Sequence, residues 1–184
     1  MAIYRPDSDA QSVSGVSESV ESPHRTVIRV LGLGGGGANA VDRMVQFGIE
    51  DVEFLAANTD LQALSRNEAP TKILLGPEFT CGHGSGGDPV VGETAAYESR
   101  KEIAAALEGT DMLFIACGMG GGTGSGAAPI VAEIARELEA VTVSVVTMPF
   151  AFEGPLRYQN ALQGIVQLQA RCDTLITVPN DRLV

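Results

Sequence analysis

The sequence predicts an α/β fold in which a mostly parallel, Rossmann-like sheet carries helices on both faces. Short, nearly continuous apolar segments recur along the chain, as expected of strands that are buried on both sides. Segments with apolar residues at helical spacing separate them, which is typical of parallel sheets with helical crossovers. Two of the apolar segments run directly into glycine-rich stretches, at the position where such sheets bind their ligands.

The first half of the structured part predicts three strands and two helices. TVIRVLGL, VEFLAA and KILL are short apolar runs, and the first of them ends in glycines. Val41, Met44 and Val45 share one face of a helical segment, and a later segment is rich in Ala, Glu and Lys. The expected strands are therefore 26–33, 52–57 and 72–75, and the expected helices are 40–47 and 92–107.

The second half continues the alternation. DMLFIAC, VTVSVVT and TLITV are apolar runs of the length that buried strands have. Val131, Ile134 and Leu138 recur at helical spacing, as do Leu162 and Ile165. The expected strands are 111–117, 141–147 and 174–178, and the expected helices are 127–138 and 155–170.

The first 25 residues differ in composition from the rest of the chain. They are rich in Ser, carry scattered charge and show no apolar period. We therefore expect a disordered leader at 1–25 and one nucleotide-binding domain at 26–184, since 184 residues with 45% apolar content suit a single core.

Charge and cysteine content exclude several classes of protein. Twelve Lys and Arg against 23 Asp and Glu give a net charge of −11, which is the wrong sign for general nucleic-acid binding. Any phosphate must therefore be held by local dipoles. Three widely spaced cysteines and two histidines predict reduced thiols and no zinc site. No apolar run is long enough to span a bilayer, so we expect a cytoplasmic protein without membrane insertion.

The first glycine-rich stretch, at 32–37, follows the first strand. It satisfies G-x-G-x-x-G between a strand and a helix, where bare backbone N–H groups can approach a phosphate. This motif alone fits a dinucleotide-binding oxidoreductase equally well. That alternative also requires an acidic ribose contact at the end of the second strand, where the sequence has Ala-Ala-Asn-Thr-Asp instead.

The second stretch, at 118–126, is the strongest local signal. Six glycines in nine residues would cost about 1 kcal/mol each in a helix, so we interpret them as positions where a ligand lies against bare backbone. Thr123 and Ser125 could add hydroxyl contacts or cap the following helix. No lysine is present, so the stretch is no Walker A loop. Two such loops, on different strands, suggest a triphosphate. A third glycine-rich segment at 82–89 contains His83, which we expect to be a surface side chain.

GGGTGSG at 120–126 resembles the signature of the tubulin/FtsZ family of GTPases. Further stretches resemble the FtsZ branch in the same order, including VLGLGGGGANAVDRMV, ANTDLQAL, MPFAFEG and TLITVPNDRL, and they cover nearly everything from Thr26 onward. The resemblance implies GTP and GDP as ligands, Mg²⁺ bridging phosphate oxygens, and GTP hydrolysis. It also implies head-to-tail self-association into filaments, contacts with other division proteins, and a place at the cytoplasmic division site.

The resemblance also assigns residues to the nucleotide. It implies that a first loop holds the α- and β-phosphates, a third loop senses the γ-phosphate, and a main loop cradles the phosphates, while Asn58 and Asp60 lie near the phosphates and the metal. Single residues would contact the ribose (Glu153), the sugar and phosphate (Arg157) and the guanine edge (Asn180). The loop residues are Gly34, Gly35, Gly36, Gly37 and Asn39 in the first, Gly84, Ser85 and Gly86 in the third, and Gly120, Gly121, Gly122, Thr123 and Gly124 in the main loop.

Several positions depart from the family pattern, and those that lose a basic residue fall near the expected ribose site. Met148 stands where Lys or Arg is common, Pro155 and Leu156 replace a pair that is often basic, and Cys117 replaces a small Ala. The family continues into a central helix and an activation domain whose acidic residues act on the neighbouring subunit's nucleotide. This chain alone is therefore expected to hold GTP, to hydrolyse it only beside a complete subunit, and to contain no catalytic residue of its own.

Two further functions stay open at this point. A regulator that binds nucleotide could cap or modulate filaments without turnover. An interaction module could keep the fold without tight nucleotide binding, although such a module would have no need to retain glycine-rich loops.

Overall fold

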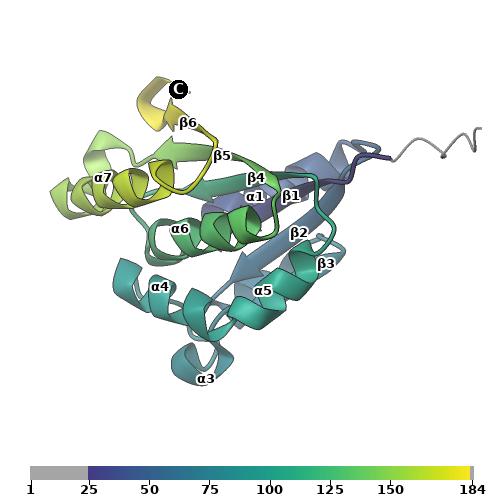
Figure 1. Cartoon of the computed structure of the whole chain (residues 1–184). Coiled ribbons are helices and arrows are strands. Elements are labelled where there is room, and N and C mark those ends of the chain that lie inside the picture. The colour runs from purple at the N-terminus through teal and green to yellow at the C-terminus, as the bar shows by residue number, and fades with distance from the viewer. Residues whose placement is uncertain (1–24, 183–184) are drawn as a thin grey trace, which may run out of the picture.

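The computed structural model describes residues 25–182, and its strands form a six-stranded sheet. The strand order is β3-β2-β1-β4-β5-β6, and every pair of neighbouring strands is parallel (Figure 1). The predicted α/β fold is therefore confirmed. The strands are β1 (Ile28–Leu33), β2 (Glu53–Asn58), β3 (Thr71–Leu74), β4 (Met112–Gly118), β5 (Val141–Met148) and β6 (Thr174–Pro179).

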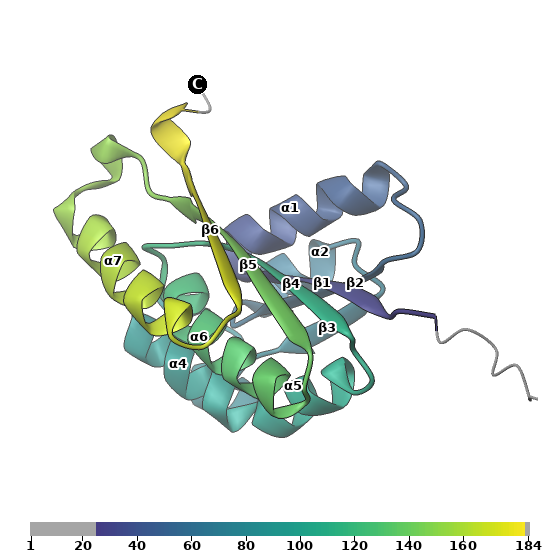
Figure 2. The same ribbon diagram turned by 45° about the horizontal axis from the view of Figure 1, so that its top comes forward.

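Helices cover both faces of this sheet (Figure 2). One face carries α1 and α2, where Val41 and Leu64 pack against Val30 and Phe54 of the strands. The other face carries the larger core beneath α4 to α7. The helices are α1 (Gly34–Gln46), α2 (Leu61–Arg66), α3 (Pro77–Thr80), α4 (Pro89–Glu98), α5 (Arg100–Leu107), α6 (Gly122–Glu137) and α7 (Pro155–Gln169), with short 3₁₀ turns η1 (Ala151–Glu153) and η2 (Asn180–Arg182).

The helix predicted over 92–107 is two helices that meet at Ser99. The Ser99 hydroxyl donates to the Leu74 carbonyl at 3.3 Å and accepts the Gly76 N–H at 2.9 Å, which ties the break to the loop after β3. A buried side chain that bonds non-local backbone competes with a continuous helix. The short helices α2 and α3 were not predicted, because neither is long enough to show a helical period.

Two helices begin earlier than predicted, inside the glycine-rich stretches. The first helix begins at Gly34 rather than at residue 40, and α6 begins at Gly122 rather than at residue 127. Low glycine propensity argued against helix there, but the first turn of a helix has few intrahelical hydrogen bonds to lose. These glycines therefore form part of the first turns of α1 and α6.

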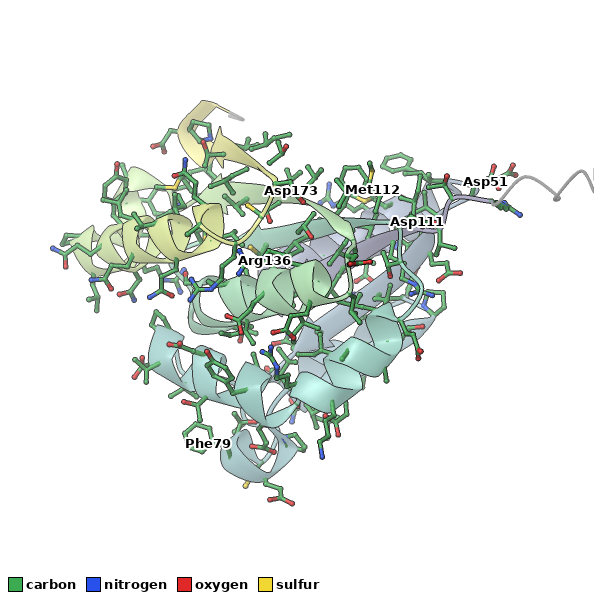
Figure 3. The ribbon with its side chains drawn as sticks, in the orientation of Figure 1. Asp51, Phe79, Asp111, Met112, Arg136 and Asp173 are labelled. Carbon is green, nitrogen blue, oxygen red and sulfur yellow. The ribbon has the colours of Figure 1, made fainter. Side chains whose placement is uncertain are left out.

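Two aspartates fix the amino ends of the strands (Figure 3). Asp111 accepts the Val27 N–H at 2.7 Å, and Asp173 accepts the Thr142 N–H at 2.7 Å. Both residues precede a strand, β4 and β6 respectively. The carboxyl ends of the strands lie at the opposite end of the sheet and stay available for a ligand.

Part of the sheet face beside α1 is not covered by the described residues. Phe114 and Val145 are only partly buried there, and Ile176 is 47% exposed. Phe114 and Val145 line an apolar groove of about 380 Å³ together with Met44 and Phe54. Ile176 does not line this groove. No helix within residues 25–182 is both long and apolar enough to cross a membrane.

Candidate functional site

A cavity of about 600 Å³ lies at the carboxyl ends of the strands. It is centred on β1 and β4, which are neighbours in the sheet, with Leu33 and Cys117 as register partners at their ends. From these ends the chain enters α1 on one face and α6 on the other face. Open parallel sheets bind ligands at such a reversal of strand order. Both glycine-rich stretches thus meet at one cavity.

The first turns of α1 and α6 line this cavity, and the first backbone N–H groups of a helix have no acceptor within that helix. Neither helix has a side-chain cap or an acidic residue in its first turn, and their N-cap residues are Leu33 and Gly121. By contrast, Asp60 caps α2 and Asp88 caps α4. An uncapped helix start carries partial positive charge and free donors, which suit a phosphate. The site therefore offers two such starts to one anion, in a chain of net charge −11.

The glycines of these stretches fall into two groups. A Cβ added to Gly35 or Gly121 would meet no atom within 4 Å, so only these backbones face open space. A Cβ on Gly37 would overlap the Ala116 carbonyl, and one on Gly126 would overlap the Pro89 carbonyl. The expectation that a ligand explains every glycine is therefore wrong, because close packing requires several of them.

The third glycine-rich segment is joined to the loop after β2. The Leu61 N–H donates to the Gly82 carbonyl at 3.0 Å, and the Gly84 N–H donates to the Thr59 carbonyl at 3.1 Å. Gly84, Ser85 and Gly86 line the cavity as a result. His83 is an exposed side chain, as expected, and it also lies on the cavity wall.

Glu153, the last residue of η1, and Arg157, in the first turn of α7, line the cavity. They form an ion pair with i, i+4 spacing, and Glu153 Oε1 also accepts the Phe150 N–H at 2.9 Å. The Arg157 side chain is 55% exposed, so water screens the pair and it adds little to stability. Asn180 reaches the cavity from η2, directly after β6.

Three of the predicted residues do not line the cavity. Gly37 packs against β4, and Asn39 is an exposed residue further along α1. Gly120 has φ +95°, and a Cβ there would lie 2.7 Å from the Arg157 carbonyl oxygen. Its N–H donates to the hydroxyl oxygen of the buried Ser125 at 2.8 Å, and Ser125 does not line the cavity either. The other predicted residues line it: Gly34, Gly35, Gly36, Gly84, Ser85, Gly86, Gly121, Gly122, Thr123, Gly124, Glu153, Arg157 and Asn180.

Sequence reasoning missed several residues of the cavity wall. Thr59, Met119, Thr147 and Pro149 all line it. Thr147 is the penultimate residue of β5 and the others directly follow a strand, so the rule that parallel sheets bind ligands at strand ends could have found them. Their side chains alone carry no signal of phosphate chemistry.

Comparisons with known proteins agree with this geometry. The sequence model of the tubulin/FtsZ family GTPase domain matches residues 27–184. The structure is similar to an FtsZ dimer from M. jannaschii, solved empty, with TM-score 0.85 and 49% identity over 86% of this chain and 46% of that chain. It is also similar to CetZ1 from Haloferax volcanii as a GDP-bound monomer, with TM-score 0.79 and 26% identity over 85% of this chain and 52% of that chain.

A third similar structure is CetZ2 from Haloferax volcanii as a GTPγS-bound protofilament. Its TM-score is 0.74, and it is 28% identical over 85% of this chain and 50% of that chain. The chain thus spans about half the length of the solved structures that it matches. These matches leave the dinucleotide-binding oxidoreductase without support. The chain belongs to the tubulin/FtsZ family, and its nucleotide-binding fold is that family's GTPase domain.

Proposed function

We propose that this chain binds GTP and GDP in the cavity at the strand ends, as the nucleotide-binding part of an FtsZ-like, filament-forming GTPase. One observation carries the proposal: α1 and α6 both begin, without side-chain caps, at the same 600 Å³ cavity. Such a site suits a polyphosphate, because each phosphate oxygen can find a main-chain donor. The whole protein's place is the cytoplasm at the division site, among other division proteins.

The remaining wall residues suit the rest of a guanine nucleotide. The Glu153 carboxylate can accept hydrogen bonds from ribose hydroxyls, and the Arg157 guanidinium can donate to a phosphate. The Asn180 amide carries both a donor and an acceptor, as recognition of a base edge requires. Gly84, Ser85 and Gly86 form the part of the wall that is proposed to contact the terminal phosphate.

Magnesium fits this site as a partner of the phosphates. Mg²⁺ prefers oxygen ligands and usually takes only one or two from the protein. No group of three His, Cys, Asp or Glu side chains in residues 25–182 could hold a metal ion. The cavity does contain the oxygens of Asn58 and Asp60, which could contact the ion or its waters. When bound, the ion would neutralise charge on the phosphate oxygens.

Hydrolysis is proposed to require a second subunit. The cavity wall within the described residues contains two carboxylates, and both already accept hydrogen bonds. Asp60 Oδ1 accepts the Gln62 and Ala63 N–H groups, while Glu153 binds Arg157 and the Phe150 N–H. In-line attack needs an oriented water, and we propose that a neighbouring subunit supplies the group that orients it. The similarity to a dimer and to a protofilament supports contact between copies, which we propose to be head to tail.

The proposal is tested by nucleotide competition and turnover on the purified chain. GTP should displace a fluorescent guanine nucleotide, whereas ATP and NADH should not. Hydrolysis by the chain alone should equal the background, and rapid turnover that Thr123→Ala abolishes would contradict the need for a second subunit. Adding the chain to filaments of a full-length relative should shorten them if it caps them, and unchanged filament length would exclude capping.

A further inference from the structure

Three hydroxyl side chains from three different loops form a chain beside the cavity. The Thr59 and Thr123 hydroxyl oxygens are 2.8 Å apart, and the Ser85 and Thr123 hydroxyl oxygens are 3.2 Å apart. Thr59 follows β2, Ser85 lies in the third glycine-rich segment, and Thr123 lies in the first turn of α6. Thr123 is the middle member, so its hydroxyl proton has more than one possible acceptor.

Burial decides which way the Thr59 proton points. Thr59 is 0% exposed, and Thr123 Oγ1 is its side chain's hydrogen-bond partner among the described residues. A buried hydroxyl proton without an acceptor costs the full desolvation of that donor. Thr59 therefore donates to Thr123, because the reverse arrangement would leave the Thr59 proton without an acceptor. The Thr123 proton is then directed away from Thr59.

Two acceptors remain for the Thr123 proton. One is the Ser85 oxygen at 3.2 Å, and the other is a phosphate oxygen in the cavity that Thr123 lines. A charged acceptor gives a stronger hydrogen bond than a neutral hydroxyl. A bound nucleotide would therefore draw the Thr123 proton away from Ser85, and the Ser85 hydroxyl can then donate its own proton to Thr123 or to the same phosphate.

We infer that Thr59 is a positioning residue of the nucleotide site, which holds the Thr123 hydroxyl as a donor toward a phosphate. This inference rests on the proposed function, because it requires that GTP occupies the cavity. Thr59 itself acts through Thr123. Its contribution is to reduce the rotamers and proton positions that Thr123 must abandon when the anion binds.

The experiment compares GTP affinities of matched variants by isothermal titration. Thr59→Val removes the hydroxyl with little change of shape and is expected to weaken GTP binding by up to about tenfold, the upper end of the scale for one neutral hydrogen bond. Thr59→Ser keeps the hydroxyl and should bind nearly as well as the unaltered chain. The control is Thr142→Val, since Thr142 is also buried but lies at the start of β5, where its hydroxyl donates to the Ala140 carbonyl.

A double-variant cycle distinguishes positioning from a general structural role. If Thr59 acts through Thr123, Thr59→Val should cause no further loss in a Thr123→Val background. An equal loss in both backgrounds would overturn the inference, as would a Thr59→Val variant that binds GTP normally or a Thr59→Ser variant as weak as Thr59→Val. Thr59→Ala replaces Thr59→Val if the valine variant does not fold. Failure of the unaltered, folded chain to bind GTP would instead refute the proposed function.

Discussion

A methyl group on Gly124 would overlap the carbonyl oxygen of Gly118, so the first turn of α6 lies directly against the end of β4. The same test at Gly35, in the first turn of α1, meets no atom within 4 Å. The two glycine-rich stretches therefore contain glycines needed for packing and glycines that leave room for a ligand. Substitution should separate these two roles.

Gly124→Ala is expected to lower the free energy of unfolding by about 1–3 kcal/mol, the usual cost of overpacking a tight interior. The clash is with main chain, which cannot rotate away as a side chain can. Urea unfolding followed by circular dichroism measures the loss. A variant with unchanged stability would contradict the close packing of α6 against β4.

Gly35→Ala is expected to have the opposite profile. Alanine is a better helix former by up to about 1 kcal/mol, and the added methyl meets open space, so stability should stay constant or rise slightly. The methyl would, however, occupy the side of the cavity where a phosphate is proposed to lie. We expect GTP affinity to fall at least tenfold by titration calorimetry. Unchanged affinity would place the phosphates away from α1.

Arg157→Ala is expected to weaken GTP binding without destabilising the fold. Its ion pair with Glu153 is half-exposed, so the free energy of unfolding should change by less than about 0.5 kcal/mol. Arg136→Ala is the matched control, because it removes the same charge at the distant end of α6 (Figure 3). Equal losses of GTP affinity in the two variants would indicate a long-range charge effect in place of a direct contact.

Asn180→Ala tests recognition of the base. If the Asn180 amide reads the guanine edge, its loss should weaken GTP binding and narrow the difference between GTP and ATP. Competition against a fluorescent nucleotide gives both affinities. Equal weakening for GTP and ATP would show that Asn180 supports the pocket wall without reading the base.

Cys117 predicts a specific alkaline instability. Burial raises the pKa of the Cys117 thiol from 9.0 to about 12. Between these values the unfolded chain loses this proton and the folded chain keeps it, so stability falls as pH rises, by at most about 1.4 kcal/mol per pH unit. Cys117→Ala should therefore lose less stability than the unaltered chain between pH 9 and 10.5. Identical pH profiles in urea unfolding would contradict the burial of this thiol.

The sequence predicted the sheet well because its strands are buried and apolar on both faces. It located the two glycine-rich stretches that line the cavity, because glycine clusters after strands indicate a close approach to the backbone. It failed where a tertiary contact decides the local structure: Ser99 divides one predicted helix by bonding Gly76 and Leu74. It also assigned all glycines to the ligand, since only the folded chain shows that Gly126 packs against the Pro89 carbonyl.

The residues around the two glycine-rich stretches were predictable from the sequence to different degrees. Glu153 and Arg157 could be assigned to a ligand only through the family resemblance, because an i, i+4 pair at a helix start is common on protein surfaces. The place of Thr59 directly after β2 could have been found from the sequence, but the positioning role proposed for its hydroxyl could not. Its role depends on a 2.8 Å contact with a residue 64 positions away.

Amide resonances in an NMR titration with Mg²⁺ and GTP test the central claim most directly, namely that main-chain N–H groups at the starts of α1 and α6 hold the triphosphate. We expect large shifts of the amide resonances of Gly35, Gly36, Gly122 and Thr123. We expect unchanged resonances for Val27 and Thr142, whose N–H groups bond aspartates at the opposite edge of the sheet. A folded chain that binds GTP while the amides of both helix starts stay unshifted would contradict this claim.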